Sequence, residues 1–64
     1  MHFIRLQRYG DYEIVVINVA DIVLVTPGAR GTAIIGIRNH PTIHVMESVN
    51  DVHRQLGPRI DEDE

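Results

Sequence analysis

The sequence of 64 residues contains no cysteine. Disulfides and zinc sites built on cysteine thiolates are therefore excluded, and nothing indicates a secreted disulfide scaffold. A domain of this size buries only about 60% of the surface that its unfolded chain exposes, so it is marginally stable alone. With disulfides excluded, association of identical chains is the remaining means of stabilisation, and we expect a homo-oligomer.

Long apolar segments are missing too. No apolar run approaches the roughly 20 residues that a membrane-spanning helix needs. The N-terminal stretch MHFIRLQR lacks the apolar core of a signal peptide. We therefore expect a cytoplasmic protein that does not bind membranes.

Lysine is also absent, so all six basic residues are arginine. The formal net charge is −3, but the four acidic residues 61–64 supply −4, which leaves residues 1–60 at +1. Such a nearly neutral body is not expected to bind bulk nucleic acid. Arginine favours bidentate contacts to carboxylate or phosphate, although a codon or lineage bias would give the same composition.

Groups that carry out catalysis are scarce. The only serine, Ser48, lies at a predicted helix start, and the acidic residues before position 61 are scattered, so neither a nucleophile nor a carboxylate pair stands out. His40 and His44 have a spacing that suits a metal on a helix, but Pro41 forbids a helix there, and four strand residues span roughly 13 Å. We expect no enzyme, no cofactor and no metal site within one chain. Copies of one histidine gathered around a symmetry axis would be the exception.

The residues that are present are mostly β-branched and apolar. Residues 13–26, EIVVINVADIVLVT, form two apolar runs without polar alternation, which favours strands covered on both faces. Further strands are expected at residues 2–8, 32–38 and 42–46. The connections are expected at residues 9–12, 18–21, 27–31 and 39–41. Asp21 is expected to close an Asx-type turn, Gly10 to adopt positive φ, and Gly36 to mark a bulge or a close approach.

A helix is expected after the fifth strand. Ser48 is a good N-cap, Val52 and Leu56 follow helical spacing, and Gly57 with Pro58 ends the helix. The sequence therefore predicts a β-rich α+β domain in residues 1–57: a small antiparallel β-meander of about five strands with one C-terminal helix. Residues 58–64 are expected to be an acidic disordered tail.

One short helix cannot cover both faces of this sheet. Strand alternation divides the apolar side chains into two sets, one with Val15, Ile17, Val23, Val25 and Ile34, the other with Ile14, Val16, Ile22, Leu24 and Ile35. Uncovered, either set would be an aggregation-prone patch. We expect one set to face a neighbouring subunit.

The loop PGARGT, residues 27–32, is the most suggestive binding site. Its glycines free backbone N–H groups for an anion, and Arg30 supplies a fork for phosphate, although a plain hairpin turn explains the same residues. The remaining candidates lie at other strand ends or in the first turn. The two tyrosines of that turn have two alternative roles, stacking on a base or packing as partly buried side chains. The candidate ligand-binding residues are Arg8, Tyr9, Tyr12, Gly28, Arg30, Gly31, Thr32, Arg38 and His40.

Four segments resemble the small FlbD/SwrD-like flagellar proteins and similar short phage proteins. They are the opening FIRLQRYGDYEIVVI, the connection INVADIVLV, the strand GTAII and the closing IHVMESVNDV, and together they span residues 3 to about 56. The resemblance implies a compact β-rich domain with a C-terminal helix, a flagellar association in some bacteria, and no catalytic residues. Residues 39–41, Asn-His-Pro, replace the Asn-Gly or Asp-Gly turn of those proteins.

Two functional hypotheses follow. The first is a homo-oligomeric binding protein of the phage accessory type, which sequesters an anionic, nucleotide-like small molecule between subunits. It rests on arginines at loop ends and on a domain too small for an internal pocket of roughly 300 Å³. The alternative is a flagellar or phage protein–protein interaction module whose second apolar face binds a partner.

Overall fold

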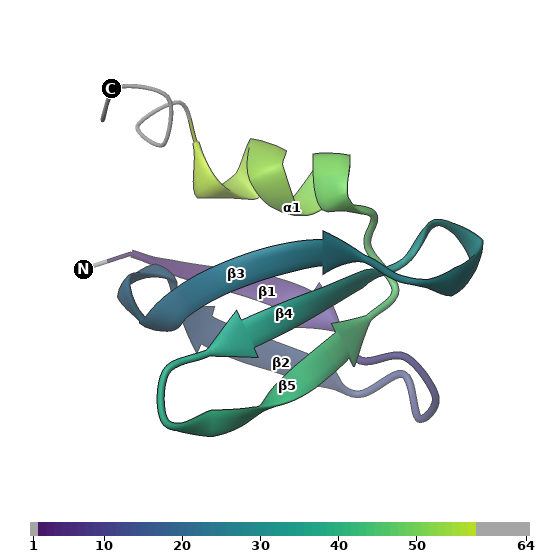
Figure 1. Ribbon diagram of the computed structural model, residues 1–64, viewed down its shortest axis with the longest axis horizontal. Coiled ribbons are helices and arrows are strands. Elements are labelled where there is room, and N and C mark those ends of the chain that lie inside the picture. The colour runs from purple at the N-terminus through teal and green to yellow at the C-terminus, as the bar shows by residue number, and fades with distance from the viewer. Residues whose placement is uncertain (1, 58–64) are drawn as a thin grey trace.

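The computed structural model describes residues 2–57, in which strands precede one α-helix (Figure 1). The strands are β1 (Phe3–Gln7), β2 (Ile14–Asn18), β3 (Ile22–Pro27), β4 (Ala33–Ile37) and β5 (His40–Val45). The helix is α1 (Val49–Leu56), and short 3-10 turns lie at η1 (Val19–Asp21) and η2 (Ala29–Gly31). The α+β class predicted from the sequence is confirmed.

The strands form two antiparallel sheets that lie one behind the other (Figure 1). One is the β1–β2 hairpin, and the other is the meander β3–β4–β5. The end of β1 joins the sheets because Arg8 bridges to Val45. The Tyr9 N–H donates to the His44 carbonyl at 2.8 Å, and the Met46 N–H donates to the Gln7 carbonyl at 2.7 Å. We call residues 7–9 with residues 44–47 the β1–β5 junction.

Glu47 completes this junction with its side chain. Its two carboxylate oxygens accept the Gln7 backbone N–H at 3.1 and 3.2 Å, and the contact is partly buried. The backbone of β1 is therefore bonded to β2 on one edge and to residues 44–47 on the other.

The core lies between the two sheets and the helix. Ile4 and Leu6 share the inner face of β1, as their alternation predicts, while Arg5 is exposed. The buried apolar side chains come from both sheets and from α1: Ile4, Leu6, Ile17, Ala33, Ile35, Val45, Val52 and Leu56.

Helix α1 begins and ends where the sequence predicts. The Ser48 hydroxyl accepts the Asp51 N–H at 3.1 Å, and Gly57 ends the helix with φ of 90°. Val52 and Leu56 are buried on its inner side, whereas His53 is exposed. Pro58, which is predicted to end the helix together with Gly57, lies outside the described residues.

Two turns differ from their predicted form. Asn18, not Asp21, makes the Asx-type contact, because its side-chain oxygen accepts the Ala20 N–H at 3.0 Å. The turn between β4 and β5 is only residues 38–39, since Asn39 adopts the left-handed conformation with φ of 58° and His40 already pairs with Ile37. Asparagine tolerates that conformation, so no glycine is needed there.

The division of apolar residues into two alternating sets is wrong in part. A bulge between Ile22 and Leu24 interrupts the alternation, so Val23 and Leu24 are both exposed while Ile22 and Val25 pack on the core. Gly36 makes room for the bulge, because a Cβ there would lie 3.2 Å from the Leu24 Cβ. The predicted close approach at Gly36 is confirmed.

Two expectations concern membranes and the C-terminus. Among residues 2–57, no helix has the length and apolar character that a bilayer crossing requires. The acidic tail predicted for residues 58–64 lies outside the part of the chain that the structure describes.

We expect Glu47→Ala to lower the free energy of unfolding by about 1–2 kcal/mol, because the Gln7 N–H loses a charged acceptor. For a domain this small, the melting temperature should fall by roughly 4–8 °C per kcal/mol. Thermal unfolding followed by circular dichroism measures this. Glu47→Gln keeps an acceptor oxygen and should lose less than half as much. Equal loss in both variants would show that the hydrogen bond is not what Glu47 contributes.

Candidate functional site

The predicted site residues lie at two different ends of the sheets. Ala33 pairs with both Pro27 and Val45, and Val45 bridges to Arg8, so residues 8–13, 28–32 and 44–48 meet at one end, the loop end. Residues 18–21 and 38–40 meet at the other, the turn end, because Ile37 pairs with Ile22 and with His40. The two ends are separated by the length of β5, whose five residue-to-residue steps span about 17 Å.

At the loop end, three polar side chains from separate elements meet. The rings of Tyr9 and His44 are stacked, with centroids 4.3 Å apart and planes inclined by 21°. The Thr32 hydroxyl lies 2.6 Å from the His44 Nε2 and 2.5 Å from the Ala29 carbonyl. A carbonyl can only accept, so Thr32 donates its one proton to Ala29. His44 must then donate from Nε2 to the Thr32 oxygen.

Gly28 is required by this contact. A Cβ at position 28 would lie 2.7 Å from the Thr32 hydroxyl and 2.9 Å from the His44 Nε2. Its backbone is extended, with φ of −112°, so the need for glycine is steric. The Gly28 N–H donates to the Thr32 carbonyl at 2.9 Å, and the Thr32 N–H donates to the Ala29 carbonyl at 3.1 Å. These two amides are thus used within the loop.

Arg30 lies at the tip of this loop in the left-handed conformation, with φ of 59° and ψ of 37°. That conformation costs a side-chain-bearing residue about 1–2 kcal/mol. Arg30 is exposed, and its guanidinium has no hydrogen bond or ion pair with the other residues of 2–57. Gly31 follows with φ of 75°, where its lack of a side chain avoids the same strain.

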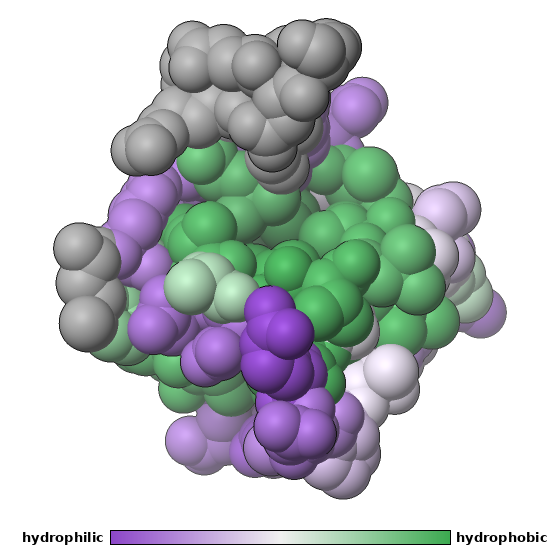
Figure 2. Space-filling model, turned by 60° about the vertical axis from the view of Figure 1, so that its left-hand side comes forward, coloured by the Kyte–Doolittle hydropathy of each residue, from purple (hydrophilic) through white to green (hydrophobic). Residues whose placement is uncertain are grey.

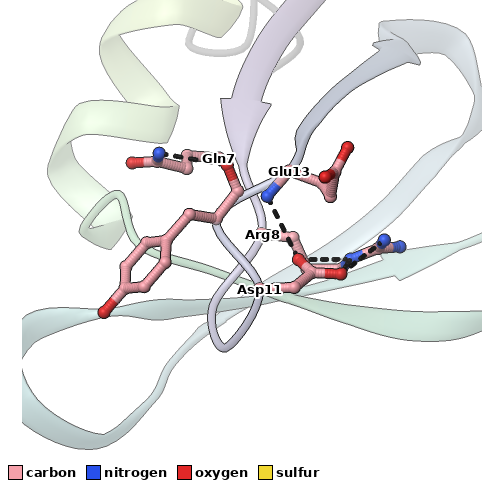
Figure 3. A network of polar contacts seen from close by, with 5 residues as sticks. Gln7, Arg8, Asp11 and Glu13 are labelled. Atoms are coloured by element: carbon pink, nitrogen blue, oxygen red, sulfur yellow. Dashed lines mark hydrogen bonds and ion pairs between the residues drawn. The ribbon is translucent and has the colours of Figure 1, made fainter.

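Arg8, by contrast, is already paired. Its Nε and Nη2 both donate to the Asp11 carboxylate, the latter at 2.9 Å, and Asp11 Oδ1 also accepts the Glu13 N–H (Figure 3). The hydrogen bond from Arg8 lowers the pKa of Asp11, and the Glu13 N–H lowers it further. The same contact raises the pKa of Arg8. Tyr12, in this turn, is 60% exposed with φ of 62°.

The remaining predicted residues lie at the turn end. The Arg38 Nη2 donates to the Ala20 carbonyl at 3.3 Å, and its Nε is 4.0 Å from the Asp21 carboxylate. The His40 Nδ1 donates to the Pro41 carbonyl at 2.8 Å. Arg8 and His40 both line a shallow groove of about 420 Å³ along β2. The groove extends from the loop end, where Arg8 lies, to the turn end, where His40 lies.

The site prediction omitted His44, the residue that links Tyr9 to Thr32. Alternation in β5 places His44 opposite Ile43 and Val45, which already indicates a side chain outside the core. Its partners were not evident because the Tyr9 contact depends on the pairing of β1 with β5, strands far apart in the sequence.

An apolar groove of about 450 Å³ lies between β3 and α1, away from the predicted residues. It is lined by Val19, Ile22, Val23, Leu24, Val25, Val49, His53 and Leu56. Figure 2 shows a broad hydrophobic face that is hollowed near its centre. Within residues 2–57, no three histidine or acidic side chains gather closely enough to hold a metal ion.

No family model, no curated protein and no solved structure matches this chain. The resemblance to FlbD/SwrD-like proteins therefore stays a prediction.

We expect Thr32→Val to release the His44 ring, because valine removes the oxygen that accepts from Nε2. In the wild-type protein, neutral His44 should carry its proton on Nε2. Long-range ¹H–¹⁵N spectra of the imidazole distinguish the tautomers, and the variant should show a mixture. Thr32→Ser keeps the hydroxyl and should retain the wild-type pattern. An Nδ1-protonated ring in the wild-type protein would contradict the proposed donor.

We expect the Asp11 carboxyl to titrate below its ordinary pKa range, and Arg8→Gln to return it toward that range. Because the folded-state pKa is lowered, the contact stabilises the fold at pH values above the unfolded-state pKa. That contribution is lost as the pH falls through the folded-state pKa. A carbon-detected pH titration of the Asp11 side chain measures the shift. An ordinary pKa in the wild-type protein would refute the paired geometry.

Proposed function

We propose that this protein is a non-enzymatic, homo-oligomeric binding domain that holds an anionic, nucleotide-like small molecule at its loop end. One observation carries the proposal: Tyr9, His44 and Thr32 meet at the same end of the sheets as the loop that presents Arg30. A planar base requires an aromatic surface, and a phosphate requires a guanidinium that is not already paired, as that of Arg30 is not within residues 2–57.

The aromatic part of the proposed site is the Tyr9–His44 stack. Tyr9 remains 41% exposed although one face of its ring lies against His44. Stacking of a base on an aromatic side chain contributes about 1–3 kcal/mol and does not depend on which base is present. The hydrogen bond from His44 to Thr32 fixes the orientation of the His44 ring, so the stack is formed before a ligand arrives.

The anionic part of the proposed site is Arg30. Arginine donates bidentately to phosphate, and a charge-assisted hydrogen bond is roughly twice as strong as a neutral one. Arg8 contributes less because Asp11 already neutralises it. Arg38 and His40 lie at the turn end, so they reach the same ligand only from another copy of the chain. This is the sense in which the proposed site lies between subunits.

Isothermal titration calorimetry with a panel of cyclic mono- and dinucleotides tests the proposal. We expect at least one of them to bind, and Arg30→Gln to weaken that binding by about 10- to 100-fold, because a charged hydrogen bond contributes about 1.5–3 kcal/mol. Tyr9→Leu should weaken binding of the same compound through loss of stacking.

Arg54→Gln is the matched control. Arg54 is an exposed arginine on α1, paired with Asp51 at 3.2 Å, and its loss should leave affinity unchanged. No heat with any compound of the panel would overturn the proposed ligand class. Equal weakening by Arg30→Gln and Arg54→Gln would indicate only a general charge effect.

A further inference from the structure

The apolar groove between β3 and α1 has no part in the proposed ligand site. Val23 and Leu24 form its outer side and are 58% and 59% exposed, although both are large apolar residues. Buried Leu56 and half-buried Val49 line it from the helix. Large apolar side chains exposed together beside a hollow mark an interaction surface.

Among the strands of residues 2–57, β3 is also an outer strand of its sheet, because β4 is its one hydrogen-bonded neighbour there. Outer strands are usually protected from association by charged residues or proline along their length. The sequence of β3 is IVLVTP, with no charge and with proline only at its last position. This strand therefore lacks the ordinary protection.

The charges of the domain indicate which partner fits. Residues 2–57 contain five arginines and five acidic residues, which leaves no net charge when histidine is neutral. Among residues 2–57, no Asp, Glu or Arg lines the groove, and His53 is the one titratable residue that does. A charged partner segment would leave its charges unpaired there. A neutral, apolar surface is required, and the Val23–Leu24 face of this same chain is one.

We propose that a second copy of this chain occupies the groove, related by a two-fold axis, so that Val23 and Leu24 of each copy pack against the other. A two-fold interface uses the same patch on both subunits, which suits a surface that carries both the hollow and the projecting side chains. A standard interface buries about 800 Å² per partner. That is roughly a sixth of the 4558 Å² surface, so a smaller, concentration-dependent dimer is expected.

This interface rests on the proposed function, which assumes a homo-oligomer, and it names the surface through which the subunits associate. The two fail separately. A dimer that gives no calorimetric signal with nucleotides refutes the ligand alone, whereas a monomer that binds a nucleotide refutes the interface.

Light scattering and sedimentation velocity over a range of concentrations test the interface. The wild-type protein should reach twice its chain mass of 7.3 kDa. Leu24→Asp should remain at 7.3 kDa over the same range, because the dimer would bury an unpaired carboxylate. Leu24→Ala, which introduces no charge, should raise the dissociation constant about tenfold.

Val16→Asp is the matched control, since Val16 is 60% exposed and lies on β2, away from the apolar groove between β3 and α1. It should dimerise like the wild-type protein. Circular dichroism should show the same fold in all variants, because each changed residue is exposed. A wild-type protein that stays monomeric at several hundred micromolar would overturn the inference, even if its groove bound a different protein. So would a dimer that Val16→Asp dissociates and Leu24→Asp does not.

Discussion

The fold depends on the pairing of the end of β1 with β5, two segments that lie far apart in the sequence. Arg8 bridges to Val45, backbone N–H groups cross in both directions, and the Glu47 carboxylate takes the amide of Gln7. Without this junction, the β1–β2 hairpin and the β3–β4–β5 meander would each have an uncovered apolar face. Two-stranded hairpins are marginal alone in water, so the core exists only when the two sheets are joined.

The candidate site is a consequence of the same junction. The Tyr9 amide donates to the His44 carbonyl, so the register that joins the sheets also brings the two residues whose rings are stacked side by side. Thr32 then holds the ring of His44 from the β3–β4 loop, and Gly28 leaves the space for that contact. Structure and site therefore share one set of contacts, and a change that loosens the junction should disturb both.

Local signals in the sequence were enough for the elements of the fold and not enough for their assembly. The Ser48 cap, the Gly57 stop and the alternation around Ile4 and Leu6 are each properties of a few neighbouring residues, and each is confirmed. The bulge at Val23 and the partners of His44 depend on strands that pair at a distance, which no local pattern specifies. For this reason the predicted cations divide between two ends, and the histidine between Tyr9 and Thr32 was missed.

The bulge in β3 accounts for the surface that the core leaves uncovered. Regular alternation would turn either Val23 or Leu24 inward, but the extra residue lets Ile22 and Val25 both reach the core while Val23 and Leu24 both project outward. Gly36 on β4 permits this arrangement, because a side chain there would press on Leu24. Bulges commonly redirect side chains at sheet edges, where strand pairing ends. The strand therefore exposes two neighbouring apolar residues together, beside a groove in which no lining residue from 2–57 is Asp, Glu or Arg. This geometry is the reason why we propose another chain at that edge.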